Sequence, residues 1–310
     1  MILVTGGLGF IGLHTARYLI DLGEDVVLTQ YRVAREPDFI KADMGKHAFV
    51  EQLDVTDADR LMDIGKKHKI TGIVHLAVPG LGAMTPAQDF NVNMQGLINV
   101  MEAARTWEVK RLGLASSIAV YSGESQGPFR EDMNLRIYGG NPTETWKKAF
   151  EIIGSHYGQR TGLDIIMLRI AGIYGPLYHS MSNLPSRFTH AAVKGQAPEM
   201  RGDTFEDDAN DLTYVKDCGK GIALLMHADS LPNKVYNVAS GVATTNKQLA
   251  DAIRRAIPNA DLPLKPGGGQ RKNAYLDISR IRKDVGYEPD FLIDKATEDY
   301  IGWLRAGNPE

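Results

Sequence analysis

The chain has 310 residues, 24% of them charged and 43% hydrophobic, and its 35 Lys and Arg against 38 Asp and Glu give a formal charge of −3. These values are ordinary for a soluble globular protein and exclude a disordered, collagenous or disulfide-rich chain. A net charge of −3 does not favour nucleic-acid binding. No apolar stretch approaches the roughly 18 residues that a membrane-spanning helix needs.

Three further features indicate the cellular setting and the absence of a metal site. Cys218 is the single cysteine, which excludes an internal disulfide and suggests a reducing compartment. An apolar run at residues 2–5 is expected to be a strand, which leaves no room for a signal peptide. No cluster of His, Cys and Asp has metal-ligand spacing, so no metal is expected. We therefore expect a cytoplasmic protein without membrane or nucleic-acid partners.

In the first half, short apolar runs alternate with helical stretches. Strands are expected at 2–5, 25–29, 73–77, 112–115 and 165–170, and helices at 8–22, 92–107 and 144–160. Such alternation is typical of βαβ units and a mostly parallel sheet. The nearly all-apolar strands favour a sheet that is covered on both faces.

After residue 170 the pattern changes. Residues 171–211 are rich in Gly, Pro, Asn, His and Met and are expected to be irregular. Further on we expect helices at 214–228, 246–257, 279–285 and 294–305, and a strand at 235–238. The prediction is an α/β protein with a Rossmann-like doubly wound parallel sheet, formed by 1–170 with 212–240 returning to it. A smaller, interleaved α/β domain comprises 171–211 and 241–310, with a cleft between the two.

A glycine-rich stretch at residues 5–12, TGGLGFIG, joins the first strand to the first helix. Its glycines fit both G-x-G-x-x-G and G-x-x-G-x-x-G. They permit a tight turn, close approach of backbone N–H groups to a pyrophosphate, and close packing of helix on strand. The helix N-terminus adds partial positive charge. The stretch thus predicts a dinucleotide site whose phosphates meet Gly6, Gly9, Phe10, Ile11 and Gly12.

The adenosine side of this site departs from the usual pattern. Dinucleotide sites commonly have an acidic residue at the end of the second strand to hold the ribose 2′-OH, and here that position is the neutral Gln30. Arg32 and Arg35 follow, and either could pair with a 2′-phosphate. The alternative is that both are solvated loop residues. We favour NADP over NAD, with Asp54 placed to meet the adenine amino group.

These motifs together resemble the extended short-chain dehydrogenase/reductase family, the NAD-dependent epimerase/dehydratase group. The resemblance covers nearly the whole length and rests on TGGLGFIG at 5–12, LDVTD at 53–57, VHLA at 74–77, NVNMQG at 91–96, ASSIAVY at 115–121, RIAGIYGP at 169–176, DLTYVKD at 211–217, YNV at 236–238 with Gly241, and Trp303. It implies a nicotinamide cofactor that also contacts Val55, Leu76, Ala77 and Asn93. It also implies a homodimer formed through the helices at 92–107 and 144–160.

The family carries out its chemistry with a Ser or Thr, a Tyr and a Lys, the last two spaced as Y-x-x-x-K. The resemblance implies that Ser117 orients the substrate oxygen and that Lys147 holds the cofactor ribose. The tyrosine position is Thr143. An aliphatic hydroxyl is far less acidic than a phenol, so Thr143 can donate a hydrogen bond but cannot readily carry a proton at neutral pH.

Several residues could take over the proton. Tyr121 and Tyr138 are both weak candidates, since family members usually use the first for packing and the second lies before the helix of Lys147. Glu144 could act as a base, although a glutamate in a first helical turn is usually a cap or dipole partner. Tyr174 lies in a packing motif.

The substrate side also differs from the family. Nucleotide-sugar members commonly carry an arginine where this chain has Asn210, although Arg271 resembles a second arginine that grips a diphosphate. His179, Asn183 and Arg187 follow Pro176 in a loop expected to line the cleft.

We therefore expect an NAD(P)-dependent enzyme that acts by hydride transfer on a sugar-like or small hydroxy or keto substrate. The alternative is a cofactor-binding sensor or scaffold that lost catalysis with the tyrosine. A third option, an interaction protein with an empty site, predicts that neither cofactor raises the melting temperature.

Overall fold

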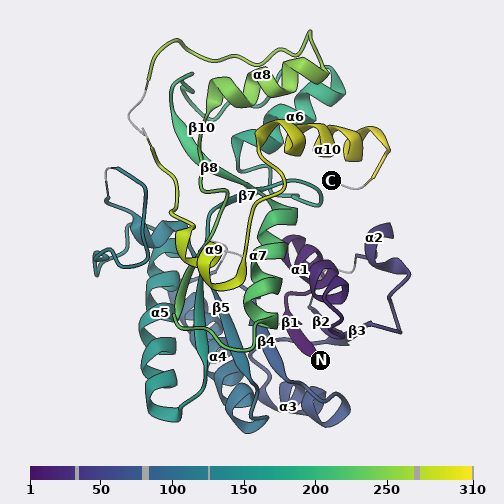
Figure 1. Cartoon of the computed structure of the whole chain (residues 1–310), viewed down its shortest axis with the longest axis vertical. Helices are drawn as coiled ribbons and strands as arrows, with labels where there is room; N and C mark the ends of the chain where they lie inside the picture. The colour runs from purple at the N-terminus through teal and green to yellow at the C-terminus, as the bar shows by residue number, and fades with distance from the viewer. Residues whose placement is uncertain (32–34, 79–83, 125, 269–272, 309–310) are drawn as a thin grey trace.

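A computed structural model describes residues 1–31, 35–78, 84–124, 126–268 and 273–308 (Figure 1). A seven-stranded parallel sheet forms its centre, in the order β3-β2-β1-β4-β5-β6-β9. The strands are β1 (Ile2–Thr5), β2 (Val26–Gln30), β3 (Ala48–Gln52), β4 (Gly72–His75), β5 (Arg111–Ser117), β6 (Ile165–Ile170) and β9 (Val235–Val238). The strand order reverses between β1 and β4, which is where a doubly wound sheet binds ligands.

Helices cover both faces of this sheet. The first face carries α1 (Phe10–Asp21), α7 (Val215–His227) and α9 (Ser279–Val285), and the second carries α3 (Ala58–Lys67), α4 (Pro86–Thr106) and α5 (Pro142–Thr161). Alternate strand residues go to opposite faces: Val4 packs in the core under α1, and Leu3 packs in the core under α4. The doubly covered sheet matches the expected Rossmann-like class.

A second, three-stranded sheet has the order β10-β8-β7. It consists of β7 (Gly172–Tyr174), β8 (Ala209–Tyr214) and β10 (Ala243–Thr245), and it is accompanied by α6 (Leu184–Lys194), α8 (Asn246–Ala256) and α10 (Ile293–Arg305). Figure 1 shows these elements gathered at one end of the molecule. Two short elements, α2 (Asp38–Lys41) and the 3₁₀ helix η1 (Ile118–Tyr121), complete the described structure.

The structure corrects several expected elements. The segment 171–211 is not irregular, because it contains β7, α6 and the start of β8. Strand β3 and helix α3 were not expected, and α4 begins at Pro86 rather than at 92. The expected division at 211/212 falls inside β8, and α9 packs on the large sheet, so the division into two domains stays a prediction. None of the described helices is long and apolar enough to cross a membrane.

Candidate active site

The turn after β1 has space only for glycine at key positions. Gly6 adopts a left-handed φ of +67°, and a Cβ there would lie 3.2 Å from the Ala77 backbone. A Cβ on Gly12 would lie 2.5 Å from the Gly6 carbonyl oxygen, and one on Gly9 would lie 2.9 Å from the same atom. Helix α1 therefore packs directly against the turn, and backbone rather than side chains lines this part of the surface.

The N-terminus of α1 has the character of an anion site. Its N-cap is Gly9, which supplies no side-chain cap, and the first turn contains no acidic residue. Phe10 and Ile11 open the helix and are half-buried. The ring of Phe10 lies 5.0 Å from that of Tyr178, so the β7–α6 loop reaches over the start of α1. The open helix end offers partial positive charge to a phosphate.

The predicted adenosine side lies at the ends of β2 and β3. Gln30 is the half-buried last residue of β2. Asp54 follows β3, and its Oδ1 accepts hydrogen bonds from the Thr56 N–H (2.9 Å) and hydroxyl (2.8 Å). Arg32 lies outside the described residues. Arg35 is half-buried, and burial lowers the pKa of its guanidinium.

Val55 continues this edge toward α4. Its carbonyl accepts a hydrogen bond from Asn99 Nδ2 at 3.0 Å. A Cβ on Gly96 would come within 2.9 Å of the Val55 side chain, so α4 lies close against this loop. The contact places α4, which carries the predicted cofactor residue Asn93, against the loop that follows β3.

The central part of the predicted cofactor site joins β4 to α4. The Leu76 N–H donates to the Thr5 carbonyl (3.2 Å) and the Ala77 N–H to the Thr5 hydroxyl (3.3 Å). Asn93 donates through Nδ2 to the Asp89 backbone and side chain, but its buried Oδ1 has no partner among the residues that the structure describes. A buried oxygen of this kind fits a ligand that offers N–H or O–H donors, as a dinucleotide does.

Lys147 lies buried on α5 behind the ends of β4 and β5. Its Nζ donates to the Ala115 carbonyl at 2.6 Å and lies 5.4 Å from the centre of the Phe150 ring. Burial lowers the pKa of Lys147 to about 8. His75 at the end of β4 contacts the Thr5 hydroxyl, and burial together with Lys147 lowers its pKa to about 3, so the imidazole is neutral.

Two further predicted catalytic residues lie at helix N-termini. Thr143 is half-buried in the first turn of α5, one turn before Lys147 on the same helix face. Ser117 ends β5, and its Oγ accepts a hydrogen bond from the Ala119 N–H at 3.1 Å. That bond leaves the Ser117 hydroxyl proton available for a substrate oxygen.

Tyr121 belongs to a buried polar network. Its hydroxyl donates to Asn237 Oδ1 (2.8 Å) and accepts from Arg169 Nη1 (2.9 Å). Arg169 also binds Glu151 through Nε (2.9 Å) and Nη2 (2.8 Å). Burial raises the pKa of Tyr121 to about 12. These contacts argue against the predicted catalytic use of Tyr121, because its hydroxyl is fully engaged and weakly acidic.

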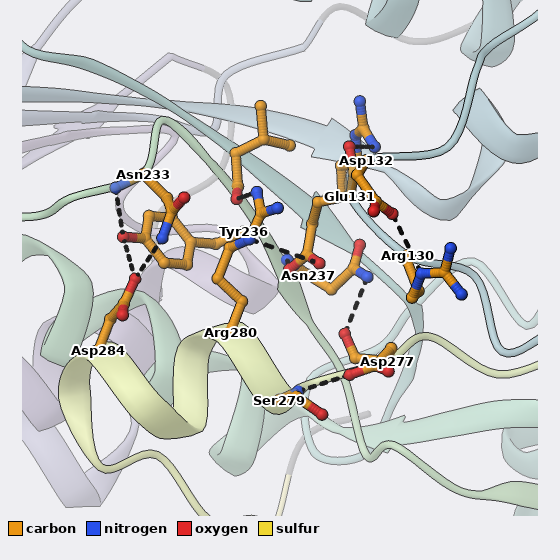
Figure 2. A network of polar contacts seen from close by, with 12 residues as sticks. Arg130, Glu131, Asp132, Asn233, Tyr236, Asn237, Asp277, Ser279, Arg280 and Asp284 are labelled. Carbon is orange, nitrogen blue, oxygen red and sulfur yellow. Dashed lines mark hydrogen bonds and ion pairs between the residues drawn. The ribbon is translucent and has the colours of Figure 1, made fainter.

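The same network continues toward β9 and α9. Asn237 lies among the polar contacts of Figure 2, where its N–H donates to Glu131 Oε1 (3.0 Å) and its Nδ2 donates to the Asp277 carbonyl (2.9 Å). Arg280 approaches Glu131 at 3.8 Å, and burial raises the pKa of the Glu131 carboxyl. Sequence reasoning missed this network, since its members come from distant parts of the chain.

The remaining proton-carrier candidates are Tyr138, Glu144 and Tyr174. Tyr138 precedes α5 and is 68% exposed. Glu144 is buried, but its carboxylate accepts from Lys148 Nζ (2.7 Å) and from the Gly140 N–H (2.9 Å). Tyr174 is buried, and burial strongly raises the pKa of its hydroxyl. None of the three bonds to Lys147.

The predicted substrate residues have mixed positions. His179 is exposed in the β7–α6 loop. Asn183 caps α6 by accepting from the Ser186 N–H (2.9 Å), and its Nδ2 donates to the Ile173 carbonyl (2.8 Å). A structural role thus accounts for both ends of that amide, and its substrate contact stays a prediction. Arg187 has a buried Nε that finds no partner in the described part of the chain. Arg271 lies outside the described residues.

Known proteins share this fold over the whole chain. Residues 2–239 match the family model described as the NAD dependent epimerase/dehydratase family. A UDP-glucuronate 4-epimerase from Thermodesulfobacterium geofontis is 26% identical, covering 98% of this chain and 95% of the relative. Two UDP-glucose 4-epimerase structures also match: one from Thermotoga maritima with UDP-glucose (TM-score 0.84, 23% identity, 99% of both chains) and one from Thermus thermophilus with NAD (0.79, 25%, 98% of both).

The family match spans well over half of the chain and includes the glycine turn, Ser117 and Lys147. Among the described residues, no group of three or more His, Cys, Asp or Glu side chains could hold a metal ion. The chain belongs to the NAD-dependent epimerase/dehydratase family and is an enzyme that acts by hydride transfer on a sugar-like or small hydroxy or keto substrate.

Proposed function

We propose that this enzyme interconverts the hydroxyl and keto forms of a secondary alcohol on a nucleotide-linked sugar. The observation that carries the proposal is the shared edge of the sheet. The glycine turn follows β1, Ser117 ends β5, and Lys147 is held at the end of β5 by the Ala115 carbonyl. The relatives that match end to end are named as UDP-sugar epimerases.

The proposed division of labour follows from these positions. A bound nicotinamide dinucleotide supplies the hydride acceptor and donor. The Gly6–Gly12 turn and Asn93 hold the cofactor, and Lys147 contacts its ribose. Ser117 orients the reacting oxygen with its hydroxyl proton, and Thr143 donates a second hydrogen bond. Thr143 cannot supply the proton itself, so another group must carry it.

We infer NADP as the preferred cofactor. Gln30 places no negative charge beside a 2′-phosphate, and the half-buried Arg35 has no carboxylate partner among the described residues. Calorimetry of the cofactor-stripped protein with NAD and with NADP measures the preference. A lower Kd for NAD would reverse the inference, and the solved relative with NAD makes that outcome a real alternative.

The substrate class can be tested with matched pairs. We propose UDP-glucose and UDP-glucuronate as probes, each compared with the free sugar. Asn210 stands on β8 where nucleotide-sugar members carry arginine, so this chain lacks one charge-assisted contact to a diphosphate. Turnover of the UDP-linked compounds but not of the free sugars supports the proposal. Equal turnover of both would mean that the enzyme recognises the sugar and not the nucleotide.

Replacing Thr143 with tyrosine separates catalysis from simple cofactor binding. Wild-type turnover, followed by the absorbance of the reduced nicotinamide or by product analysis, supports an active enzyme. Turnover that appears only in Thr143→Tyr identifies the native chain as a cofactor-binding sensor or scaffold. Failure to bind either cofactor by calorimetry refutes both readings.

We also propose a homodimer formed through α4 and α5. Ile98 and Ile152 are large apolar residues on these helices and are 43% and 63% exposed. Sedimentation of wild type and of Ile152→Lys tests this surface, because a buried lysine would dissociate the dimer. The single buried Cys218 supports a cytoplasmic setting, which fractionation of the source cells would test.

A further inference from the structure

The site needs a proton carrier that its sequence motif no longer supplies. Thr143 stands where family members carry the catalytic tyrosine. The contacts of Tyr121 and the exposure of Tyr138 argue against either as the replacement. Tyr121 is engaged by Asn237 and Arg169, and Tyr138 is largely exposed before α5. The carrier must lie beside Ser117, because that hydroxyl holds the reacting oxygen in the proposed function.

Lys147 is placed for this task by its own contacts. Within the described part of the chain, its Nζ makes one hydrogen bond, to the Ala115 carbonyl, and has no carboxylate partner. Ala115 precedes Ser117 by two residues on β5, so this bond holds Nζ near the end of the strand that carries Ser117. Pairing with β4 ends at Leu114, opposite His75, so Lys147 occupies the space just beyond the end of β4.

We propose that Lys147 is the acid–base group of this enzyme, in addition to its contact with the cofactor ribose. In the oxidising direction the substrate O–H bond breaks and a new N–H bond forms on Nζ, so the neutral amine becomes an ammonium. The oxygen electron pair forms the carbonyl as the hydride leaves carbon for the nicotinamide that the family activity supplies. The reverse reaction returns the same proton to oxygen. This inference rests on the proposed function.

The electrostatic setting brings the titration of this amine close to neutral pH. Burial lowers the pKa of Lys147 to about 8, so about a tenth of the amine is neutral at pH 7 and about half at pH 8. A general acid–base group works best when its pKa lies near the operating pH. A lysine with a carboxylate partner would stay charged, as expected for a residue that only holds the cofactor.

The titratable groups around Lys147 are already engaged. His75 on β4 is neutral and contacts the Thr5 hydroxyl. Asp89 on α4 accepts from Trp146 Nε1 at 2.6 Å and from Asn93. Glu151, one turn further along α5, is bound by Arg169 and by the Ser116 hydroxyl. None of these groups bonds to Nζ or supplies the missing proton carrier.

Lys147→Arg separates proton transfer from cofactor binding. Arginine keeps the charge and the donors but does not lose its proton in proteins. With UDP-glucose as the probe, we expect the variant to lose at least about 100-fold in kcat while its NAD and NADP Kd values, measured by calorimetry, stay close to wild type. Lys148→Arg is the matched control, since Lys148 is equally buried but pairs with Glu144.

Chemical rescue provides the second readout. Lys147→Ala leaves space for methylamine or ethylamine, and we expect rescue that increases with the basicity of the amine, as proton transfer requires. Unchanged kcat and pH profile in Lys147→Arg, or abolished turnover in Tyr138→Phe, would overturn the inference while the proposed function stands. A wild type that binds cofactor but converts no probe refutes the proposed function and this inference together.

Discussion

Replacing Lys147 with methionine tests the burial of this amine without any need for a substrate. The pKa of Lys147 falls from 10.5 to about 8 because the charged form is buried. Between these two values the unfolded chain holds a proton that the folded chain does not. The free energy of unfolding of the wild type should therefore rise as pH increases from about 8 to 10.5. The difference in pKa corresponds to about 3 kcal/mol over that window.

The variant removes the buried charge and the hydrogen bond to the Ala115 carbonyl. Below pH 8 the wild type carries the full cost of burying an ammonium, and Lys147→Met does not. Loss of the bond to the Ala115 carbonyl costs the variant about 1 kcal/mol at every pH. We expect the variant to be about 2 kcal/mol more stable than wild type at pH 7 and about 1 kcal/mol less stable at pH 10.5.

Urea unfolding between pH 7 and 10.5, followed by tryptophan fluorescence, measures this crossing. Lys46→Met, at an exposed position, shows what the loss of one surface charge does under the same conditions. Parallel stability curves for wild type and Lys147→Met would refute the reasoning. That result would mean that the amine is solvated in the folded protein, and the case for proton transfer by Lys147 would lose its physical basis.

Three further outcomes are expected. Acid should destabilise the protein as pH falls from 6.5 toward 3, because the folded protein holds His75 neutral. Urea unfolding of His75→Gln should therefore show up to about 5 kcal/mol less loss of stability over that range. Gly12→Ala should lower the free energy of unfolding by about 1–3 kcal/mol and abolish cofactor binding measured by calorimetry, because the added Cβ would lie 2.5 Å from the Gly6 carbonyl oxygen. Its control is Gly302→Ala on α10, where the added Cβ meets open space; this change should raise the free energy of unfolding by about 0.5–1 kcal/mol. Arg169→Met should cost about 3–5 kcal/mol in chemical denaturation because the buried Glu151 loses its partner.

The strands and helices with strong apolar patterns were predictable from sequence, and the others were missed for physical reasons. Helix α3 buries only Leu61 and Ile64, so its apolar stripe is narrow among many charges. Helix α6 has Pro185 as its second residue. A proline suggests the end of an element in sequence, but it suits the first helical turn after the Asn183 cap. Strand β3 lies at the edge of the sheet and is only partly buried.

The candidate site was predictable to a similar degree. The glycines, together with their place between the first strand and the first helix, located the turn, because its steric demand is local. The surroundings of Tyr121 were not accessible in this way: its partner Asn237 is 116 residues away in sequence. The environment of Lys147 likewise depends on which carbonyl at the end of β5 reaches its Nζ.

Strand β9 belongs to the large sheet but follows the elements of the second sheet in sequence, which limits how the chain can be divided. Strand β9 joins the large sheet beside β6 only after the chain has formed β7, α6 and β8. A fragment that stops at residue 170 would leave β6 as an open edge and would deprive Arg169 and Tyr121 of the Asn237 side of their network. Residues 1–170 therefore do not form a unit that could be moved to another protein by themselves. The strand that completes their sheet, β9, comes later in the sequence.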